Sequence, residues 1–178
     1  MLPKLKNHLL KKDIAAHNPH RKRKICSLKT AKLIGIIAEI TNEDSYKNIF
    51  SLIRQLQQYG IKVFLLGYIH SKSIPFFCLK QLSAEYFCEK ELNFYGKPDL
   101  PRLKSLLHEP FDMLIDFTSE KYIPISYILQ VTHAQFIVGA NRHHHNLYDL
   151  FLDVGKKHTI QELSQMIDHY TNKLTNKQ

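Results

Sequence analysis

Cysteine is scarce in this sequence, and long apolar runs are absent from it. The three cysteines, Cys26, Cys78 and Cys88, form no CxxC pair and cannot all be paired within one chain. There is no apolar stretch of about 18 residues for a membrane span, and the N-terminus has no continuous apolar run of the kind that a secretory signal needs. We therefore expect a cytoplasmic protein whose cysteines are reduced.

Glycine is missing from the place where a nucleotide-binding loop requires it. The first expected strand, residues 32–40, runs into a turn that reads AEITNEDS, with no glycine to let the backbone approach a pyrophosphate. Glu39, Glu43 and Asp44 put negative charge where a phosphate would lie. The phosphate-binding motifs GxxxxGKS and GxxxxGKT do not occur either. These absences argue against NAD, FAD or nucleotide binding, and we expect no cofactor.

Signatures of hydrolytic and of metal chemistry are absent as well. No serine lies in a GxSxG motif, so we assign no Ser-His-Asp arrangement and no catalytic residue. The run His143-His144-His145 could bind a metal ion, but successive side chains diverge, and no HExxH motif or carboxylate at ligand spacing accompanies it. We interpret it as a chance run on the surface and expect no metal site.

Positive charge is plentiful but confined to one end of the chain. The 178 residues carry a formal net charge of +9, with 44% hydrophobic and 23% charged residues, which are the proportions of an ordinary globular domain. Ten of the 25 Lys and Arg residues and one of the 16 Asp and Glu residues lie within residues 1–32, which leaves fifteen of each sign in residues 33–178. The excess charge therefore belongs to an N-terminal arm, and the rest of the chain is neutral.

We divide the chain into a basic arm, residues 1–31, and a single α/β domain, residues 32–174. The start of the arm could form a basic amphipathic helix of about a turn and a half, because lysines separate four leucines at helical spacing: Leu2, Leu5, Leu9 and Leu10. A cluster that attracts phosphate follows: Arg21, Lys22, Arg23 and Lys24. The alternative is a solvated tail, or one that covers part of the protein's own body.

Apolar segments of the body alternate between strand-like and helix-like patterns, which is typical of an open α/β sheet. The expected strands are residues 32–40, 61–69, 84–88, 113–117, 135–138 and 148–154. The expected helices are residues 43–59, 101–108, 124–133 and 159–174, with Thr41 and Thr159 as N-caps of the first and last. Residues 70–82 are ambiguous and could include a short helix.

We predict a three-layer Rossmann-like or flavodoxin-like sandwich of five to six mostly parallel strands. The expected strand order is 3-2-1-4-5, with the sixth strand added at the edge. In such sheets ligands bind beyond the carboxyl ends of the strands, near the point where the strand order reverses. Here that switch point lies between residues 32–40 and residues 113–117.

Candidate ligand-binding residues gather in the segment from Phe111 to Arg142. The polar residues at its strand ends are Asp116, Thr118, Ser119, Asn141 and Arg142. An aspartate at the end of a buried strand needs a partner, because a lone buried carboxylate is costly. Thr118, Ser119 and the start of the following helix could together form a modest anion site. The alternative is that the two hydroxyls only cap that helix.

The stretch FDMLIDFTSEKYIPISYILQVTHAQFIVGANR, together with the NFYGKP loop, resembles an uncharacterised bacterial family known only as a domain of unknown function. The same stretch is similar to the N-terminal half of GT-B heptosyltransferases, with residues 134–139 matching an Ala-to-Gly strand. That resemblance implies a Rossmann-like fold. It implies no reaction, because the sugar nucleotide of those enzymes sits mainly in a second half for which this chain has no room.

We therefore expect a non-enzymatic binding or adaptor protein whose basic arm engages an anionic partner, RNA or ribosome ahead of a membrane surface. The alternative is a small-molecule-binding protein or a transferase-like enzyme with its site at the strand ends around Asp116. A self-associating structural protein is a third possibility, and the oligomeric state is left open.

Overall fold

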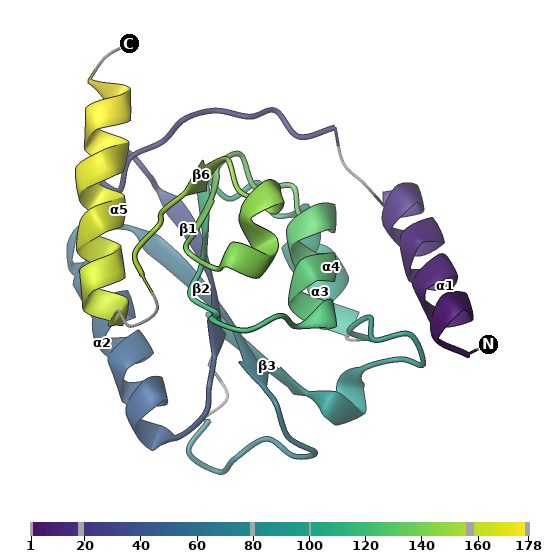
Figure 1. The fold of residues 1–178 in the computed structure, drawn as a ribbon. Coiled ribbons are helices and arrows are strands. Elements are labelled where there is room, and N and C mark those ends of the chain that lie inside the picture. The colour runs from purple at the N-terminus through teal and green to yellow at the C-terminus, as the bar shows by residue number, and fades with distance from the viewer. Residues whose placement is uncertain (1, 18–19, 79–80, 100, 156–158, 177–178) are drawn as a thin grey trace.

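The computed structural model describes residues 2–17, 20–78, 81–99, 101–155 and 159–176, and these form a three-layer α/β sandwich (Figure 1). Within them one sheet has six strands: β1 (Leu33–Glu39), β2 (Lys62–Ile69), β3 (Ala84–Cys88), β4 (Met113–Asp116), β5 (Ile137–Gly139) and β6 (Leu150–Phe151). The helices are α1 (Leu2–His17), α2 (Glu43–Gln58), α3 (Pro101–His108), α4 (Ile123–Val131) and α5 (Ile160–Thr175), with the short 3-10 helices η1 (Glu89–Glu91) and η2 (Arg142–Leu147).

The strand order is β3-β2-β1-β4-β5-β6, and each neighbouring pair is parallel. This confirms the predicted fold class and the predicted order with the sixth strand at the edge. β1 is central because it pairs with β2 on one side and β4 on the other, and it is buried on both faces because helices cover both sides of the sheet. A Cβ atom on Gly35 would lie 2.7 Å from Leu114 Cδ1, so the glycine lets neighbouring side chains pack closely over β1.

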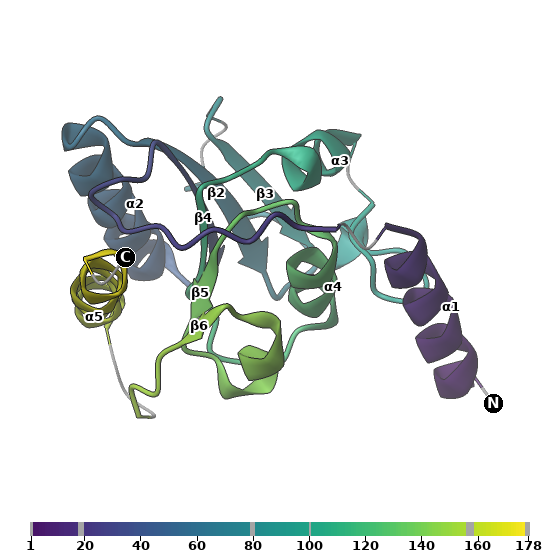
Figure 2. The same cartoon turned by 90° about the horizontal axis from the view of Figure 1, so that it is seen from above.

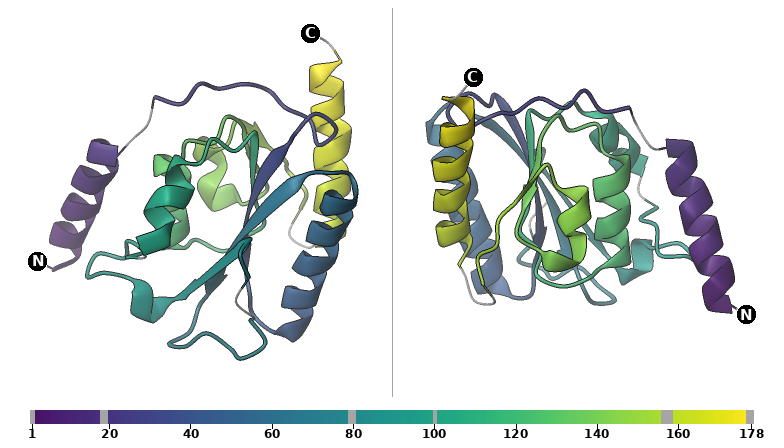
Figure 3. Two further views of the ribbon diagram at one scale, coloured as in Figure 1. Left: turned by 180° about the vertical axis from the view of Figure 1, so that it is seen from behind. Right: turned by 45° about the horizontal axis from the view of Figure 1, so that its top comes forward.

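Helices cover both faces of the sheet and divide the core in two (Figures 1 and 3). On one face α2 and α5 pack against a cluster that includes Ile36, Leu65 and Val138. On the other face α3 and α4 pack against a second cluster that includes Ile37, Leu66 and Leu114. Because successive residues of a strand face opposite sides, Ile36 and Ile37 contribute to different clusters.

Two local predictions differ from the structure. The N-cap of α2 is Asn42 and not Thr41, because the Asn42 side chain accepts a hydrogen bond from Ser45 N at 2.8 Å and Ser45 Oγ returns one to Asn42 O. The sixth strand is only two residues long, Leu150–Phe151. At the last helix the predicted cap is confirmed, since Thr159 and Glu162 form a capping box. No helix forms within the described part of residues 70–82.

The start of the arm is a helix of 16 residues, α1, which is longer than the sequence pattern predicted. Leu10 and Ile14 pack against the second core cluster, so the later part of the apolar side faces the body, whereas Leu5 is 51% exposed. Lys97 Nζ lies 3.0 Å and 2.8 Å from the two carboxylate oxygens of Asp13. Burial opposes ionisation of Asp13, but hydrogen bonds from Lys97 and Tyr127 outweigh it and lower the pKa of this carboxyl.

The rest of the arm crosses the sheet at the amino ends of the strands before it enters β1 (Figure 2). Lys24 N donates a 3.2 Å hydrogen bond to Gln135 O, just before β5, and Lys32 N donates one of 2.8 Å to Asp112, just before β4. Four residues within the predicted arm are buried: Cys26, Ser27, Leu28 and Ala31. The division at residue 31 stays a prediction, but the arm is packed against the body along this stretch.

Candidate functional site

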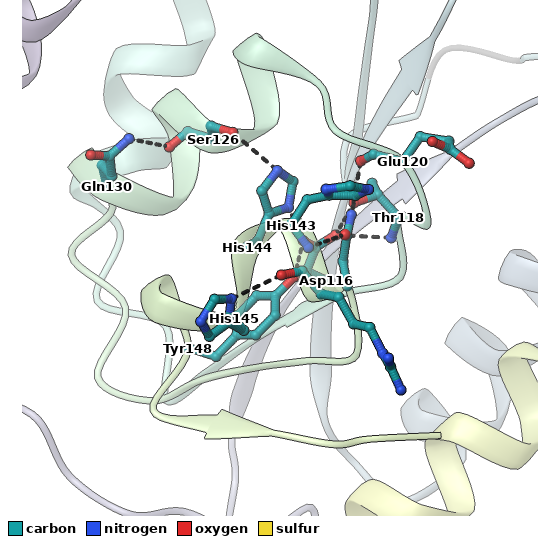
Figure 4. A network of polar contacts seen from close by, with 11 residues as sticks. Asp116, Thr118, Glu120, Ser126, Gln130, His143, His144, His145 and Tyr148 are labelled. Carbon is teal, nitrogen blue, oxygen red and sulfur yellow. Dashed lines mark hydrogen bonds and ion pairs between the residues drawn. The ribbon is translucent and has the colours of Figure 1, made fainter. Parts of the chain in front are cut away.

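Asp116 is fully buried at the carboxyl end of β4 and accepts four hydrogen bonds (Figure 4). Its Oδ1 accepts from Thr118 N at 2.9 Å and from Thr118 Oγ1 at 2.7 Å. Its Oδ2 accepts from Tyr148 OH at 2.6 Å and lies 3.2 Å from His144 Nδ1. The carboxylate therefore has the partners that its burial demands, and both oxygens are fully engaged by protein groups.

His144 links Asp116 to a serine on α4. It is 1% exposed, and its Nε2 lies 3.0 Å from Ser126 Oγ. A carboxylate can only accept, so Nδ1 carries the hydrogen that faces Asp116, and in the neutral ring Nε2 accepts from the serine hydroxyl. The prediction of a surface run is wrong for this residue. His143 and His145 are exposed, but the 3-10 turn of η2 directs His144 inward.

Asn141 and Thr118 close the same network from the neighbouring strand end. Asn141 is 3% exposed, and its Nδ2 donates to Thr118 Oγ1 at 3.2 Å and to Glu120 O at 2.8 Å. Thr118 Oγ1 thus donates a hydrogen bond to Asp116 and accepts one from Asn141. The cap of α4 lies elsewhere, at Tyr122, whose side chain makes no capping hydrogen bond.

The other two candidates from the sequence do not join this network. Ser119 is exposed. Arg142 donates to Asp153 Oδ1 at 2.6 Å on the surface, where the two side chains are 65% and 63% exposed. The structure therefore brings together Asp116, Thr118 and Asn141 and leaves Ser119 and Arg142 outside.

The Tyr148 ring packs against Gly139 of β5, next to the network. A Cβ atom on Gly139 would lie 2.5 Å from Tyr148 Cζ, so only glycine leaves room for the ring at this strand end. Burial and the nearby charge of Asp116 raise the pKa of the Tyr148 phenol. The hydroxyl therefore stays protonated at neutral pH and donates to Asp116.

Side chains of the protein also meet at the switch point itself. Tyr122 OH donates a short hydrogen bond to Glu39 Oε1 at the end of β1, and the Tyr122 ring packs edge-on against Tyr68 and His70. Burial and the Glu39 carboxylate raise the pKa of Tyr122. This contact joins the β1 and β4 sides of the sheet across the point where ligands commonly bind in α/β folds.

A second polar region lies where the arm meets the body, near the amino ends of β5 and β6. Arg21 Nη2 donates to Asp149 Oδ1 at 2.7 Å and to Oδ2 at 2.6 Å, and the Arg21 side chain is only 10% exposed. Arg21 Nη1 is buried and has no hydrogen-bond partner among the described residues. A cavity of about 480 Å³ lies at this junction, with a lining that includes His20, Arg21, Arg23, Gln130 and Asn146.

The other cations of the cluster remain accessible. Lys22, Arg23 and Lys24 are exposed, and the Arg23 side chain is 76% exposed although its Nε lies 3.4 Å from Asp149 Oδ1. One carboxylate, Asp149, thus faces two guanidinium groups. The junction keeps a net positive charge.

The described residues contain no group of three or more His, Cys, Asp or Glu side chains placed to hold a metal ion. In the same part of the chain, no helix combines the length and the apolar character that crossing a membrane requires.

The parallel six-stranded sheet with helices on both faces defines an open three-layer α/β protein. The chain belongs to DUF6913, a family of unknown function, whose model matches residues 4–174. No curated protein and no solved structure matches the chain significantly. The resemblance to an uncharacterised family is confirmed, whereas the similarity to heptosyltransferases stays a prediction. The match begins within α1, so the family model covers the arm as well as the sheet.

Proposed function

We propose that this protein binds single-stranded RNA, and that the junction between arm and body is where it recognises phosphate. The observation that carries the proposal is the guanidinium of Arg21, a lining residue of this cavity, which Asp149 holds on one side and whose buried Nη1 has no hydrogen-bond partner among the described residues. A buried cationic donor without an acceptor is costly, and a phosphate oxygen would supply the missing acceptor.

The arrangement of the remaining cations supports the same partner. Lys22, Arg23 and Lys24 follow Arg21 directly and are exposed, so a chain of phosphates could contact several of them at once. Asp149 fixes Arg21, and the hydrogen bond from Lys24 N to Gln135 O fixes the backbone. Arg21 and the backbone that carries the next cations are therefore held in place before the partner arrives, which lowers the entropy lost on binding.

The packing of α1 favours RNA over a membrane surface. A helix that binds a membrane buries its apolar side in the lipid. In α1, Leu10 and Ile14 are instead packed against the second core cluster. The exposed side of the helix carries lysines, among them Lys4, Lys11 and Lys12, which suit a phosphate backbone without insertion into lipid.

The test is the salt dependence of RNA binding by the full-length chain. Fluorescence anisotropy with a labelled oligouridylate of about 12 nucleotides gives the affinity at several salt concentrations. If Lys22 and Lys24 each contact a phosphate, the double variant K22A/K24A loses two contacts. The slope of log K against log salt then becomes shallower by about 1.4, at roughly 0.7 per phosphate for single strands.

A charge-matched variant controls for the loss of net charge. Lys72 and Lys90 are exposed and follow β2 and β3 at the carboxyl ends of the strands, whereas residues 20–32 of the arm cross the amino ends (Figure 2). K72A/K90A removes the same two charges and is expected to keep the wild-type slope. Equal slopes for all three proteins, or no binding by the wild type, would refute the proposal.

A further inference from the structure

We propose that Ser126, His144 and Asp116 form a nucleophilic centre that reacts with carboxylic esters, with Ser126 as the nucleophile, His144 as the general base and Asp116 as the residue that positions the base. The proposal is independent of RNA binding, because these side chains do not line the cavity at the arm. Its basis is the pair of contacts that run through one imidazole: 3.2 Å from Asp116 Oδ2 to Nδ1 and 3.0 Å from Nε2 to Ser126 Oγ.

The direction of these contacts is the one that activates a serine. The Asp116 carboxylate keeps the hydrogen of His144 on Nδ1, so Nε2 presents its lone pair to the serine hydroxyl. Thr118 and Tyr148 hold Asp116 in place through three further hydrogen bonds. The imidazole therefore has one tautomer and one orientation before any substrate arrives.

Exposure increases along the chain of contacts in the order that an active serine needs. Asp116 is 0% exposed and His144 is 1% exposed, whereas Ser126 is partly exposed. Ser126 lies in the first turn of α4, where the helix dipole favours the negative charge that develops on an attacked carbonyl oxygen. Of the three residues, the serine is the most exposed.

The reaction balances without a cofactor. Ser126 Oγ bonds to the ester carbonyl carbon while its proton passes to His144 Nε2, and the bond from that carbon to the leaving oxygen then breaks as His144 returns the proton to it. The alcohol departs and leaves an acyl-serine. A water molecule repeats the sequence, with its proton also passing through His144, and releases the carboxylic acid.

A fluorophosphonate probe tests the nucleophile without knowledge of the substrate. The Ser126 oxygen displaces fluoride from phosphorus, and peptide mass spectrometry locates the adduct. We expect the wild-type chain to be labelled at Ser126 at least about 100-fold faster than at the exposed Ser119, the scale of general-base assistance. S126A should lose both the adduct and the release of p-nitrophenolate from p-nitrophenyl acetate.

Two histidine variants distinguish the role of His144 from that of its exposed neighbour His143. H144Q removes the base and is expected to slow labelling of Ser126 by about 100-fold. H143Q changes an exposed histidine one position away and should leave the rate unchanged. Labelling of wild-type Ser126 no faster than that of Ser119 overturns the proposal even if H144Q fails to fold. An unchanged rate in folded H144Q also overturns it.

Discussion

Replacing Asp116 with alanine is expected to lower the free energy of unfolding by about 4 kcal/mol. The carboxylate accepts hydrogen bonds from Thr118, Tyr148 and His144 inside the core, so its removal leaves several buried donors without an acceptor. Each such donor costs roughly 1–3 kcal/mol. Urea denaturation followed by far-ultraviolet circular dichroism measures the change.

The variant D116N is the matched control for shape. Asparagine fills the same space and still accepts from Thr118, so it should lose less stability than D116A. Its NH₂ group would donate toward His144 Nδ1, which moves the imidazole hydrogen to Nε2 and removes the base that faces Ser126. We therefore expect D116N to stay folded yet to label slowly at Ser126. Equal stability of D116A and the wild type would contradict this account of the network.

Replacing Asp149 with alanine is expected to cost about 3–5 kcal/mol, the scale for leaving a buried charge unpaired. Asp149 accepts from Arg21 and also from Ile137 N at 2.8 Å, so it ties the arm to the first residue of β5. Its side chain is 9% exposed. The loss should release the arm as well, and limited proteolysis between Arg21 and Lys24 would detect that release.

The exposed ion pair between Arg142 and Asp153 is the control for this prediction. Its shortest contact is 2.6 Å, the same as that between Arg21 and Asp149, but its side chains are 65% and 63% exposed. Solvent screens such a pair, so D153A should change stability by less than about 1 kcal/mol. Similar losses in D149A and D153A would mean that burial does not set the strength of the Arg21 contact.

Most of the sheet could be predicted from the sequence because each strand is marked by a local run of apolar residues. Apolar runs such as residues 61–69 leave few alternatives to a buried parallel strand, and the helices between them force parallel crossovers. The expected order 3-2-1-4-5, with the sixth strand at the edge, is confirmed. The cap at Asn42 and the brevity of β6 were missed, because single side-chain contacts decide such ends.

The sequence predicts only some of the residues in the Asp116 network. Asp116, Thr118 and Asn141 could be placed together because parallel strands end at one edge of the sheet. Ser126 and Tyr148 were not identified, since no local motif marks them, and His144 is indistinguishable in sequence from its exposed neighbours. Which of three consecutive histidines turns inward depends on the 3-10 turn of η2, which the sequence pattern did not reveal.

The contacts of the arm were also not predictable from the sequence. The composition predicts the charge of the arm, but the sequence does not decide between a solvated tail and one that packs on the body. The partner of Arg21 lies 128 residues away at Asp149, and the partner of Asp13 lies 84 residues away at Lys97. Contacts of that sequence separation depend on the folded sheet and leave no local pattern.

Hydrogen–deuterium exchange of the full-length chain, with and without oligouridylate, tests the central claim most directly, because it locates the anion. We predict that RNA slows amide exchange in residues 20–24 and 146–147, which include lining residues of the cavity at the arm. Residues 117–122, which follow the carboxyl end of β4, should exchange as before. Protection confined to residues 117–122, or no change in the arm at an RNA concentration that saturates binding, would contradict the assignment of the arm as the RNA-binding element.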